Sequence, residues 1–266
     1  MRALVRNDFV ACRSGHKVGK SKLDAAIAFW WALTRPGGRV VVTATAGHQL
    51  ENILWPELRW LYQHAPKPLG GRMFDDYHKG IKFKSGSEII GLTTRDAEAF
   101  AGLSGANLLF IVDEASGFPA PIFDAVFGNL AGGGKVLLTG NPTRTSGGFF
   151  DAFHSKRAAW KTLHISSRES PNFHGENIPG LATPAWLEWA KTNWGEGSPS
   201  FDVRVEGNFP KQDSNTVIAL SEVEDAVLRW ETTDPDGPLE VGLDVARFGD
   251  DKTVMCARRG KRVVLF

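Results

Sequence analysis

Residues 14 to 21 combine the types and the spacing that phosphate binding requires. The stretch reads SGHKVGKS, and its ending fits the phosphate-binding loop pattern G-x-x-x-x-G-K-[ST], although serine replaces the first glycine. In such a loop, backbone N–H groups at a helix N-terminus face the phosphates, the lysine neutralises their charge and the hydroxyl holds Mg²⁺. A chance G-K-S at a helix start is the alternative. We favour a phosphate-binding loop made of Ser14, Gly15, His16, Lys17, Val18, Gly19, Lys20 and Ser21.

Two acidic residues follow an apolar run later in the chain. The run LLFIV predicts a strand buried on both faces, which delivers Asp113 and Glu114 at its carboxyl end. In nucleotide hydrolases an aspartate at this place reaches Mg²⁺, and a following glutamate acts as the general base on water. The alternative is an acidic cap before a helix at 119 to 128. With the upstream loop, the pair makes ATP hydrolysis by a strand-inserted P-loop enzyme the leading interpretation, with ATP and Mg²⁺ as cofactors.

Another predicted strand, in LLTGNPT at 137 to 143, delivers Thr139 and Asn141 to the same sheet edge. An amide there can sense the terminal phosphate or orient water, and pass the loss of that phosphate on to a neighbouring loop. The alternative is that Gly140, Asn141 and Pro142 simply form a turn.

The segment VTATAGHQLENILWPEL, from position 42, predicts a strand, a threonine-containing loop and a helix. Hydroxyls and amides at such a helix start suit phosphate contacts with nucleic acid. Thr43 and Thr45 are alternatively ordinary β-branched strand residues.

The elements that must position these residues alternate along the chain. Apolar periodicity and turn residues predict strands at 10–12 and 39–46, helices at 21–33 and 47–65, a hairpin at 80–94 turning at Ser85–Gly86, strands within 107–117, 135–143 and 160–166, and helices at 121–127 and 147–157. In the helix at 21–33, Leu23, Ala26, Ile27 and Trp30 share one face. This alternation predicts an α/β fold with a doubly wound, mostly parallel sheet covered on both faces.

The rest of the chain differs in character. Residues 166–215 are rich in Ser, Pro, Asn and Gly around an amphipathic helix at 183–194, whose tryptophans we interpret as core packing rather than a ligand platform. ETTDPDGP at 231–238 reads as a linker. LEVGLDVA and KTVMCARRGKRVVLF then predict two strands of a further sheet, too few for a stable domain alone.

Composition limits the classes of protein. The 266 residues carry a formal charge of +1, so any nucleic-acid surface must be local. Cys12 and Cys256 lie far apart in apolar runs, which indicates two reduced core thiols rather than a disulfide. No apolar stretch approaches the roughly 20 residues that span a bilayer, so we expect a soluble protein without a membrane partner.

Seven segments in this order carry a resemblance to a known family. RSGHKVGKS, VVVTATAGHQ, AFAGLSG, LLFIVDEASG, TGNPTRTSGGFF, VRVEGNFPKQDSN and VGLDVARFGDDKTV are together similar to the large terminase subunit of tailed bacteriophages, the ATPase that moves viral DNA into a capsid and cuts it. The resemblance implies a P-loop ATPase domain of the RecA-like (ASCE) type at 1–210, a linker or lid-like region at 211–238, and the first strands of an RNase H-like nuclease domain at 239–266.

The resemblance also implies roles for individual residues. Lys20, Glu114 and Asn141 would be catalytic, residues 14–21 would bind the nucleotide, and Ser21 and Asp113 would hold the metal. Asp244 would be one metal ligand of the nuclease, whose other carboxylates come from later strands, beyond Phe266. We therefore expect no DNA cleavage by these 266 residues.

The family resemblance further implies partners and a setting. These are double-stranded DNA, the portal protein, the small terminase subunit and further copies in a ring, in the host cell cytoplasm. For the charge-stabilising arginine, Arg13, Arg95 and Arg144 stay open, because Ala101–Gly102 and His16 stand where relatives carry arginine. The alternatives are a helicase-like remodelling ATPase and an inactive nucleotide-binding or assembly fragment.

Overall fold

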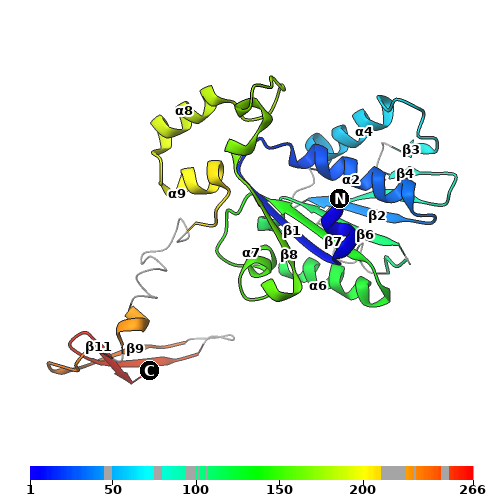
Figure 1. Cartoon of the computed structure of the whole chain (residues 1–266). Coiled ribbons are helices and arrows are strands. Elements are labelled where there is room, and N and C mark those ends of the chain that lie inside the picture. Colours follow the sequence, from blue (N-terminus) through cyan, green and yellow to red (C-terminus); the bar gives the residue numbers. More distant parts are fainter. Residues whose placement is uncertain are drawn as a thin grey trace. The chain divides into compact units, whose positions relative to one another are not determined.

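A mostly parallel sheet forms the centre of the first part of the chain. The computed structural model describes residues 1–44, 50–74, 80–93, 100, 102–105, 107–210, 226–230, 232–246 and 252–265 (Figure 1). The chain divides into two compact units, Met1–Pro210 and Lys211–Phe266.

The strands of the first unit follow the order β3-β4-β5-β2-β6-β7-β1-β8 among the described residues. Their bounds are β1 (Phe9–Ser14), β2 (Arg39–Ala44), β3 (Arg72–Phe74), β4 (Gly80–Lys82), β5 (Glu88–Thr93), β6 (Leu108–Asp113), β7 (Lys135–Gly140) and β8 (Lys161–Ile165). From β5 to β8 all neighbours pair in parallel, while β3 and β4 are antiparallel. The predicted α/β sheet is confirmed, and β7 lies between β1 and β6 as the strand-inserted arrangement requires.

Helices cover both faces of this sheet. The α-helical and π-helical elements are α1 (Arg2–Arg6), α2 (Lys20–Thr34), a π-helical turn η1 (Leu50–Leu54), α4 (Trp55–Gln63), α6 (Ala120–Asn129), α7 (Gly148–Phe153), α8 (Pro184–Trp194), α9 (Pro199–Phe201) and the π-helical η7 (Asp202–Glu206). Short 3₁₀ turns are η2 (Ala115–Gly117), η3 (Leu130–Gly132), η4 (Arg157–Ala159), η5 (Ser167–Glu169) and η6 (Pro171–Phe173). Figure 1 shows α2 and α4 on one face of the sheet and α6 and α7 on the other.

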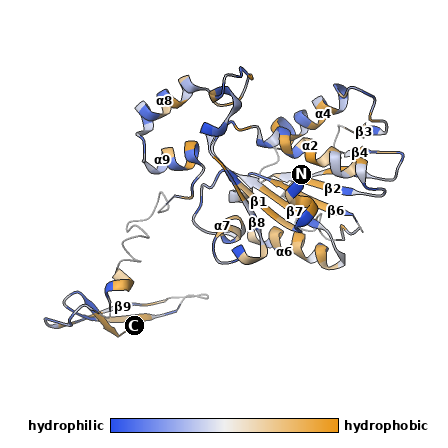
Figure 2. Ribbon diagram, viewed as in Figure 1, coloured by the Kyte–Doolittle hydropathy of each residue, from blue (hydrophilic) through white to orange (hydrophobic). Residues whose placement is uncertain are grey.

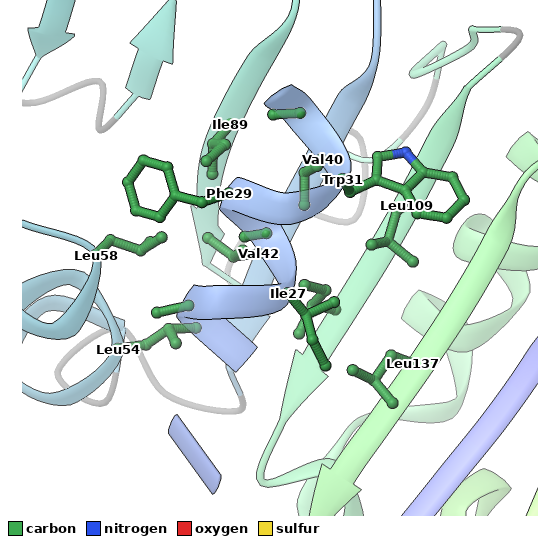
Figure 3. Close-up of a cluster of buried hydrophobic side chains, with 14 of the residues drawn as sticks. Ile27, Phe29, Trp31, Val40, Val42, Leu54, Leu58, Ile89, Leu109 and Leu137 are labelled. Carbon is green, nitrogen blue, oxygen red and sulfur yellow. The ribbon is translucent and has the colours of Figure 1, made fainter. Parts of the chain in front are cut away.

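Two apolar clusters hold these layers together. In the first, side chains of α2, η1 and α4 pack on β2, β5 and β6, as Figure 3 shows for Phe29, Leu54 and Leu58. The second cluster lies between α6, α7 and the opposite face of the sheet. Figure 2 shows the hydrophobic residues concentrated in the central strands. Because β6 is covered on both faces, all of its residues are buried, and this explains its unbroken apolar run.

The apolar face predicted for the first long helix is wrong in part. Leu23 is 45% exposed, whereas Asp24, Ala25 and Ala28 are buried. Helix α2 carries apolar residues around most of its circumference, so periodicity alone does not select the face that meets the sheet. The burial of Asp24 inside this face is the feature that the pattern did not indicate.

Other helices and strands have bounds that differ from the predicted ones. The helix expected at 47–65 is seen as η1 followed by α4, with residues 45–49 outside the described part. The helix expected at 147–157 ends at Phe153. The hairpin of β4 and β5 is confirmed, with its turn at Gly86 (φ +80°), while the short strand β3 was not predicted.

The second unit contains an antiparallel sheet of β9 (Leu239–Asp244), β10 (Val254–Arg259) and β11 (Arg262–Leu265) in the order β11-β10-β9. The expectation of two strands is wrong for the described residues. The second predicted run is divided by a turn at Gly260, whose φ of +53° only glycine adopts easily.

Two further expectations concern cysteines and membranes. Cys12 is buried and Cys256 half-buried, and both are free thiols. Burial raises the pKa of the Cys12 thiol to about 11. Of the helices that the structure describes, none is both long and apolar enough to cross a membrane.

Candidate functional site: a phosphate-binding loop and its acidic strand

The predicted phosphate-binding loop joins β1 to α2. Ser14 is the last residue of β1, and Gly19 (φ +85°) is the residue that precedes the first turn of α2. A side chain at Gly15 would collide with Ser167 Oγ and the Val205 carbonyl. The glycine is therefore needed one position later than in the usual pattern, where η5 and η7 press against the loop.

The first half of the loop is held by backbone hydrogen bonds. The Gly15 N–H donates to the Ile165 carbonyl at 3.0 Å, and the His16 N–H donates to the Arg204 carbonyl at 2.7 Å. The Lys17 carbonyl accepts from the Ala182 N–H at 2.8 Å. Because the amides of Gly15 and His16 are engaged within the chain, phosphate contacts from this loop have to come from residues 17–21.

Lys20 and Asn141 meet across the carboxyl edge of the sheet. Lys20 Nζ donates to Asn141 Oδ1 at 3.1 Å and lies 3.4 Å from the Gly15 carbonyl. Asn141 Nδ2 donates to the Ser14 carbonyl at 2.7 Å. One amide thus contacts the lysine and the backbone of the loop together, because β7 and β1 are adjacent strands.

Ser21 and Asp113 form the second connection between the loop and the sheet. Ser21 Oγ donates to Asp113 Oδ2 at 2.9 Å, and the Glu114 N–H donates to Asp113 Oδ1 at 2.9 Å. Burial raises the pKa of the Asp113 carboxyl, and the Ser21 hydrogen bond and Lys20 oppose that rise.

Asp24 is a buried carboxyl beside this pair that the sequence did not indicate. It lies on α2, is fully buried, and its Oδ2 accepts from Thr139 Oγ1 at 2.5 Å. Its Oδ1 has no hydrogen-bond partner among the residues that the structure describes. Burial, followed by the neighbouring Asp113, raises the pKa of Asp24 well above its ordinary value. The signal in the sequence is a single acid between the apolar residues of this helix segment.

Glu114 stands at the mouth of the same edge. Its φ of +53° is rare for a residue other than glycine and turns the chain sharply after β6. Burial raises the pKa of the Glu114 carboxyl, opposed mainly by Lys20. Such a shift moves a carboxylate toward the basicity that proton transfer from water requires.

An open cavity of ≈ 390 Å³ lies beside these groups. It is lined by residues 16–22 of the loop, by Glu114 and Asn141, by Ile53 and Glu57 of the η1–α4 segment, and by residues 179–181. Ser14 and Gly15 do not line it. Ile53 and Glu57 come from the segment at 42–58 that we considered for phosphate contacts with nucleic acid, and residues 179–181 come from a segment without any phosphate-binding pattern; neither was predicted to line this cavity.

His16 lies in this lining as a neutral imidazole. Burial, together with the positive charges of Lys20, Arg204 and Lys17, lowers the pKa of His16 to about 4. At neutral pH the loop therefore takes its positive charge from its lysines and not from this histidine.

Other predicted site residues do not join the cluster. Arg13 binds the Gly207 carbonyl and Asn208 with Nη1, and it does not line the ≈ 390 Å³ cavity. Arg144 is exposed, and Arg95 and Thr45 lie outside the described residues. Asp244 is exposed on β9 of the second unit. Within the part of the chain that the structure describes, no group of three or more His, Cys, Asp or Glu side chains could hold a metal ion.

This chain is similar in sequence and in structure to large terminase subunits of bacteriophages. No family model matches it. The probable terminase large subunit of Enterobacteria phage P7 is 27% identical over 273 residues, which cover 95% of this chain and 54% of that protein. The resemblance to large terminase subunits is confirmed. This terminase-like chain spans about half the length of the curated relative it matches.

Solved structures agree with this terminase-like fold. The large terminase of a thermophilic bacteriophage has a TM-score of 0.61 at 13% identity, covering 96% of this chain and 60% of its own; the same protein is known in complex with ADP. The HK97 bacteriophage large terminase has a TM-score of 0.61 at 17% sequence identity, and the match covers 96% of this chain and 57% of that one. The ATPase domain of the Thermus phage P74-26 large terminase has a TM-score of 0.54 at 16% sequence identity, and the match covers 75% of this chain and 87% of that one. The first unit therefore has the P-loop NTPase fold of these proteins.

Proposed function

We propose that this chain is the ATP-hydrolysing motor part of a viral DNA-packaging terminase. The observation that carries the proposal is a pair of hydrogen bonds, Lys20 to Asn141 and Ser21 to buried Asp113, beside the cavity that Lys20, Ser21 and Asn141 line. Four residues from α2, β6 and the end of β7 meet there, at the edge where parallel α/β sheets bind ligands. The ADP complex of the thermophilic bacteriophage terminase supports a nucleotide as the ligand.

The chain's own residues have distinct tasks in this proposal. Amides of residues 17–21 and the Lys20 ammonium bind the phosphates of ATP. Ser21 and Asp113, two oxygen donors already 2.9 Å apart, fit the hard-ligand preference of Mg²⁺ and would hold it. Bound Mg²⁺ would neutralise charge on the phosphates.

Glu114 is the general base of this proposal. Its carboxylate lines the cavity from the residue after Asp113, and its raised pKa favours acceptance of a proton from water. The left-handed backbone at Glu114 ends the direction of β6, and Glu114 shares the cavity lining with residues 16–22 of the loop.

Asn141 is proposed to couple hydrolysis to movement. Its Oδ1 accepts from Lys20 while its Nδ2 donates to the Ser14 carbonyl. When Lys20 turns to a phosphate, the first of these bonds is exchanged and the second remains. The asparagine can therefore transmit the state of the nucleotide to β1 and β7.

The substrate and partners follow from the terminase resemblance. We infer that hydrolysis drives double-stranded DNA into a procapsid, with the portal protein, the small terminase subunit and further copies of the chain in a ring as partners. The second unit is proposed to be the start of an RNase H-like nuclease domain, with Asp244 as one metal ligand. The proposed domains are 1–210, 211–238 and 239–266.

Steady-state ATP hydrolysis, measured with and without duplex DNA, tests this function. We expect Mg²⁺-dependent release of phosphate that increases when DNA is added. Binding of ATP without turnover under both conditions would contradict the motor and favour an inactive assembly module. Stimulation by single strands together with unwinding of duplexes would instead favour a helicase-like enzyme.

A further inference from the structure

A second cavity, of ≈ 470 Å³, lies in the first unit and shares no lining residue with the first. It is bounded by β1, α7, η4, β8 and residues 208–209. Arg13 and Arg157 line it together with two histidines, His154 and His164. Its lining, as far as the structure describes it, contains no carboxylate. The cavity is therefore positively charged.

Arg13 is the fixed cation of this cavity. Its Nη1 donates to the Gly207 carbonyl at 3.1 Å and to Asn208 Oδ1 at 3.0 Å. Its guanidinium carbon lies 5.7 Å from the ring centre of Phe153 and 5.6 Å from that of Phe209. All four partners are uncharged. The guanidinium is thus held in one place by neutral groups.

The charge of Arg13 is not compensated by a carboxylate in the described parts of the chain. Arg13 is half-buried, and charges withdrawn from water are normally paired because desolvating an ion costs free energy. Here burial lowers the pKa of Arg13, and no acidic neighbour contributes to raising it. Two acids of the flanking elements are engaged elsewhere, since Asp151 pairs with Lys156 and Glu206 with Arg168.

Residues 204–208, in η7 and just after it, contact both Arg13 and the phosphate-binding loop. Arg13 immediately precedes Ser14, and Gly207 and Asn208 immediately follow η7. The Arg204 carbonyl of η7 accepts from the His16 N–H at 2.7 Å. A group that binds at Arg13 therefore acts on residues that fix the first half of the nucleotide loop.

We propose that the cavity around Arg13 and Arg157 binds phosphate groups of the DNA backbone. Arginine recognises phosphate through several N–H donors, and Nη1 is the nitrogen that is already engaged. The aromatic faces beside the cavity are taken by Arg13, so they do not offer a platform for a nucleobase. Arg157 and His164 are exposed at the cavity, where a long polyanion can reach them. The inference rests on the proposed function, which supplies DNA as that polyanion.

The test is the salt dependence of duplex DNA binding by the 266-residue protein. Binding releases counterions, and log K falls with log salt by about 0.9 for each neutralised phosphate. We expect Arg157→Gln and Arg13→Gln each to make this slope shallower by about 0.9. Lys84→Gln, which removes an exposed charge in the β4–β5 turn, is the matched control and should leave the slope unchanged.

Unchanged slopes in both arginine variants would overturn the proposal. If Arg13→Gln does not fold, Arg157→Gln decides alone, because its side chain is exposed. Arg157→Gln could abolish the binding of inorganic phosphate and leave the salt dependence of DNA binding unchanged. This result would overturn DNA as the source of the phosphate.

The ATPase assay separates this inference from the proposed function. A wild-type protein that does not hydrolyse ATP contradicts the motor, whereas the DNA slopes test the cavity whether or not hydrolysis occurs. In an active protein, we expect Arg157→Gln to lose most of the DNA-dependent increase in hydrolysis at limiting DNA. If Arg157→Gln kept the full DNA-dependent increase in ATP hydrolysis at every DNA concentration, the result would contradict the link between this cavity and the nucleotide loop.

Discussion

Asp24 and Thr139 form the most deeply buried polar contact of the site. They join α2 to β7 one helical turn beyond Ser21, and two residues before Asn141. Because Asp24 Oδ1 lacks a partner and Asp113 is a close acidic neighbour, ionised Asp24 is unfavourable in the folded protein. The ionised Asp24 carboxylate therefore lowers the free energy of unfolding at neutral pH.

Replacing Asp24 by asparagine tests that cost. The pKa of Asp24 is raised on folding, so the native state binds the proton more tightly and stability falls as pH rises above the ordinary value of 3.8. We expect Asp24→Asn to be more stable than the wild type near pH 7 and to lose that advantage near pH 4. Urea unfolding followed by tryptophan fluorescence measures the difference, and an equal difference at both pH values would contradict the assignment.

Thr139 offers a complementary prediction. Thr139→Val removes the donor to Asp24 and leaves a buried carboxyl without its one described hydrogen bond, which costs about 1–3 kcal/mol. Thr139→Ser keeps the hydroxyl and is the control. Equal free energies of unfolding for the valine variant and the wild type at pH 7 would show that the contact contributes nothing.

At the scale of elements, the loop and the turns that press on it determine where glycine is required. In the sequence, Ser14 stands at the first glycine position of the pattern and Gly15 follows one place late. The packing of η5 and η7 shows that the close approach occurs at Gly15. A motif based on residue spacing cannot reveal this, because Ser167 and Val205 are far away in sequence.

Gly15→Ala tests this packing. The added methyl group has to displace the backbone at Val205, so we expect weaker ATP binding and a loss of stability of about 1–3 kcal/mol. Gly128→Ala is the matched control, because nothing lies within 4 Å of that position on α6. It should raise stability by up to about 1 kcal/mol. Equal effects of the two substitutions would contradict the packing argument.

The sequence predicted the strands and their neighbours better than the surfaces of the helices. Unbroken apolar runs such as β6 identify strands in a parallel sheet, and the carboxyl edge then brings Asp113 and Asn141 together. The buried position of Asp24 and the exposure of Leu23 depend on which side of α2 meets the sheet. Packing in the folded protein determines which side of α2 faces the sheet. The local sequence does not, because α2 is apolar on most sides.

At the scale of the whole molecule, the two units differ in what they can do. The first brings its proposed site residues together, while Asp244 on β9 is exposed in the second. Among the residues that the structure describes, no cluster of acids, histidines or cysteines could hold a metal ion. The terminase resemblance supplies a nuclease only as a proposal for the second unit.

We therefore expect no cleavage of DNA by the 266-residue protein with Mg²⁺ or Mn²⁺. Two-metal cleavage needs several carboxylates to hold both ions, and Asp244 is the one nuclease ligand that the terminase resemblance implies among the described residues. A supercoiled plasmid should remain supercoiled after prolonged incubation. Metal-dependent nicking that Asp244→Asn abolishes would contradict this expectation.

The central claim is that the cavity at the loop hydrolyses ATP with Glu114 as the base. The most direct measurement compares wild type, Glu114→Gln and, as a control, Glu188→Gln on exposed α8, for ATP affinity and steady-state turnover. We predict that Glu114→Gln binds ATP with unchanged affinity and loses at least about 100-fold in turnover, while Glu188→Gln behaves as wild type. Turnover by Glu114→Gln at the wild-type rate would contradict the claim.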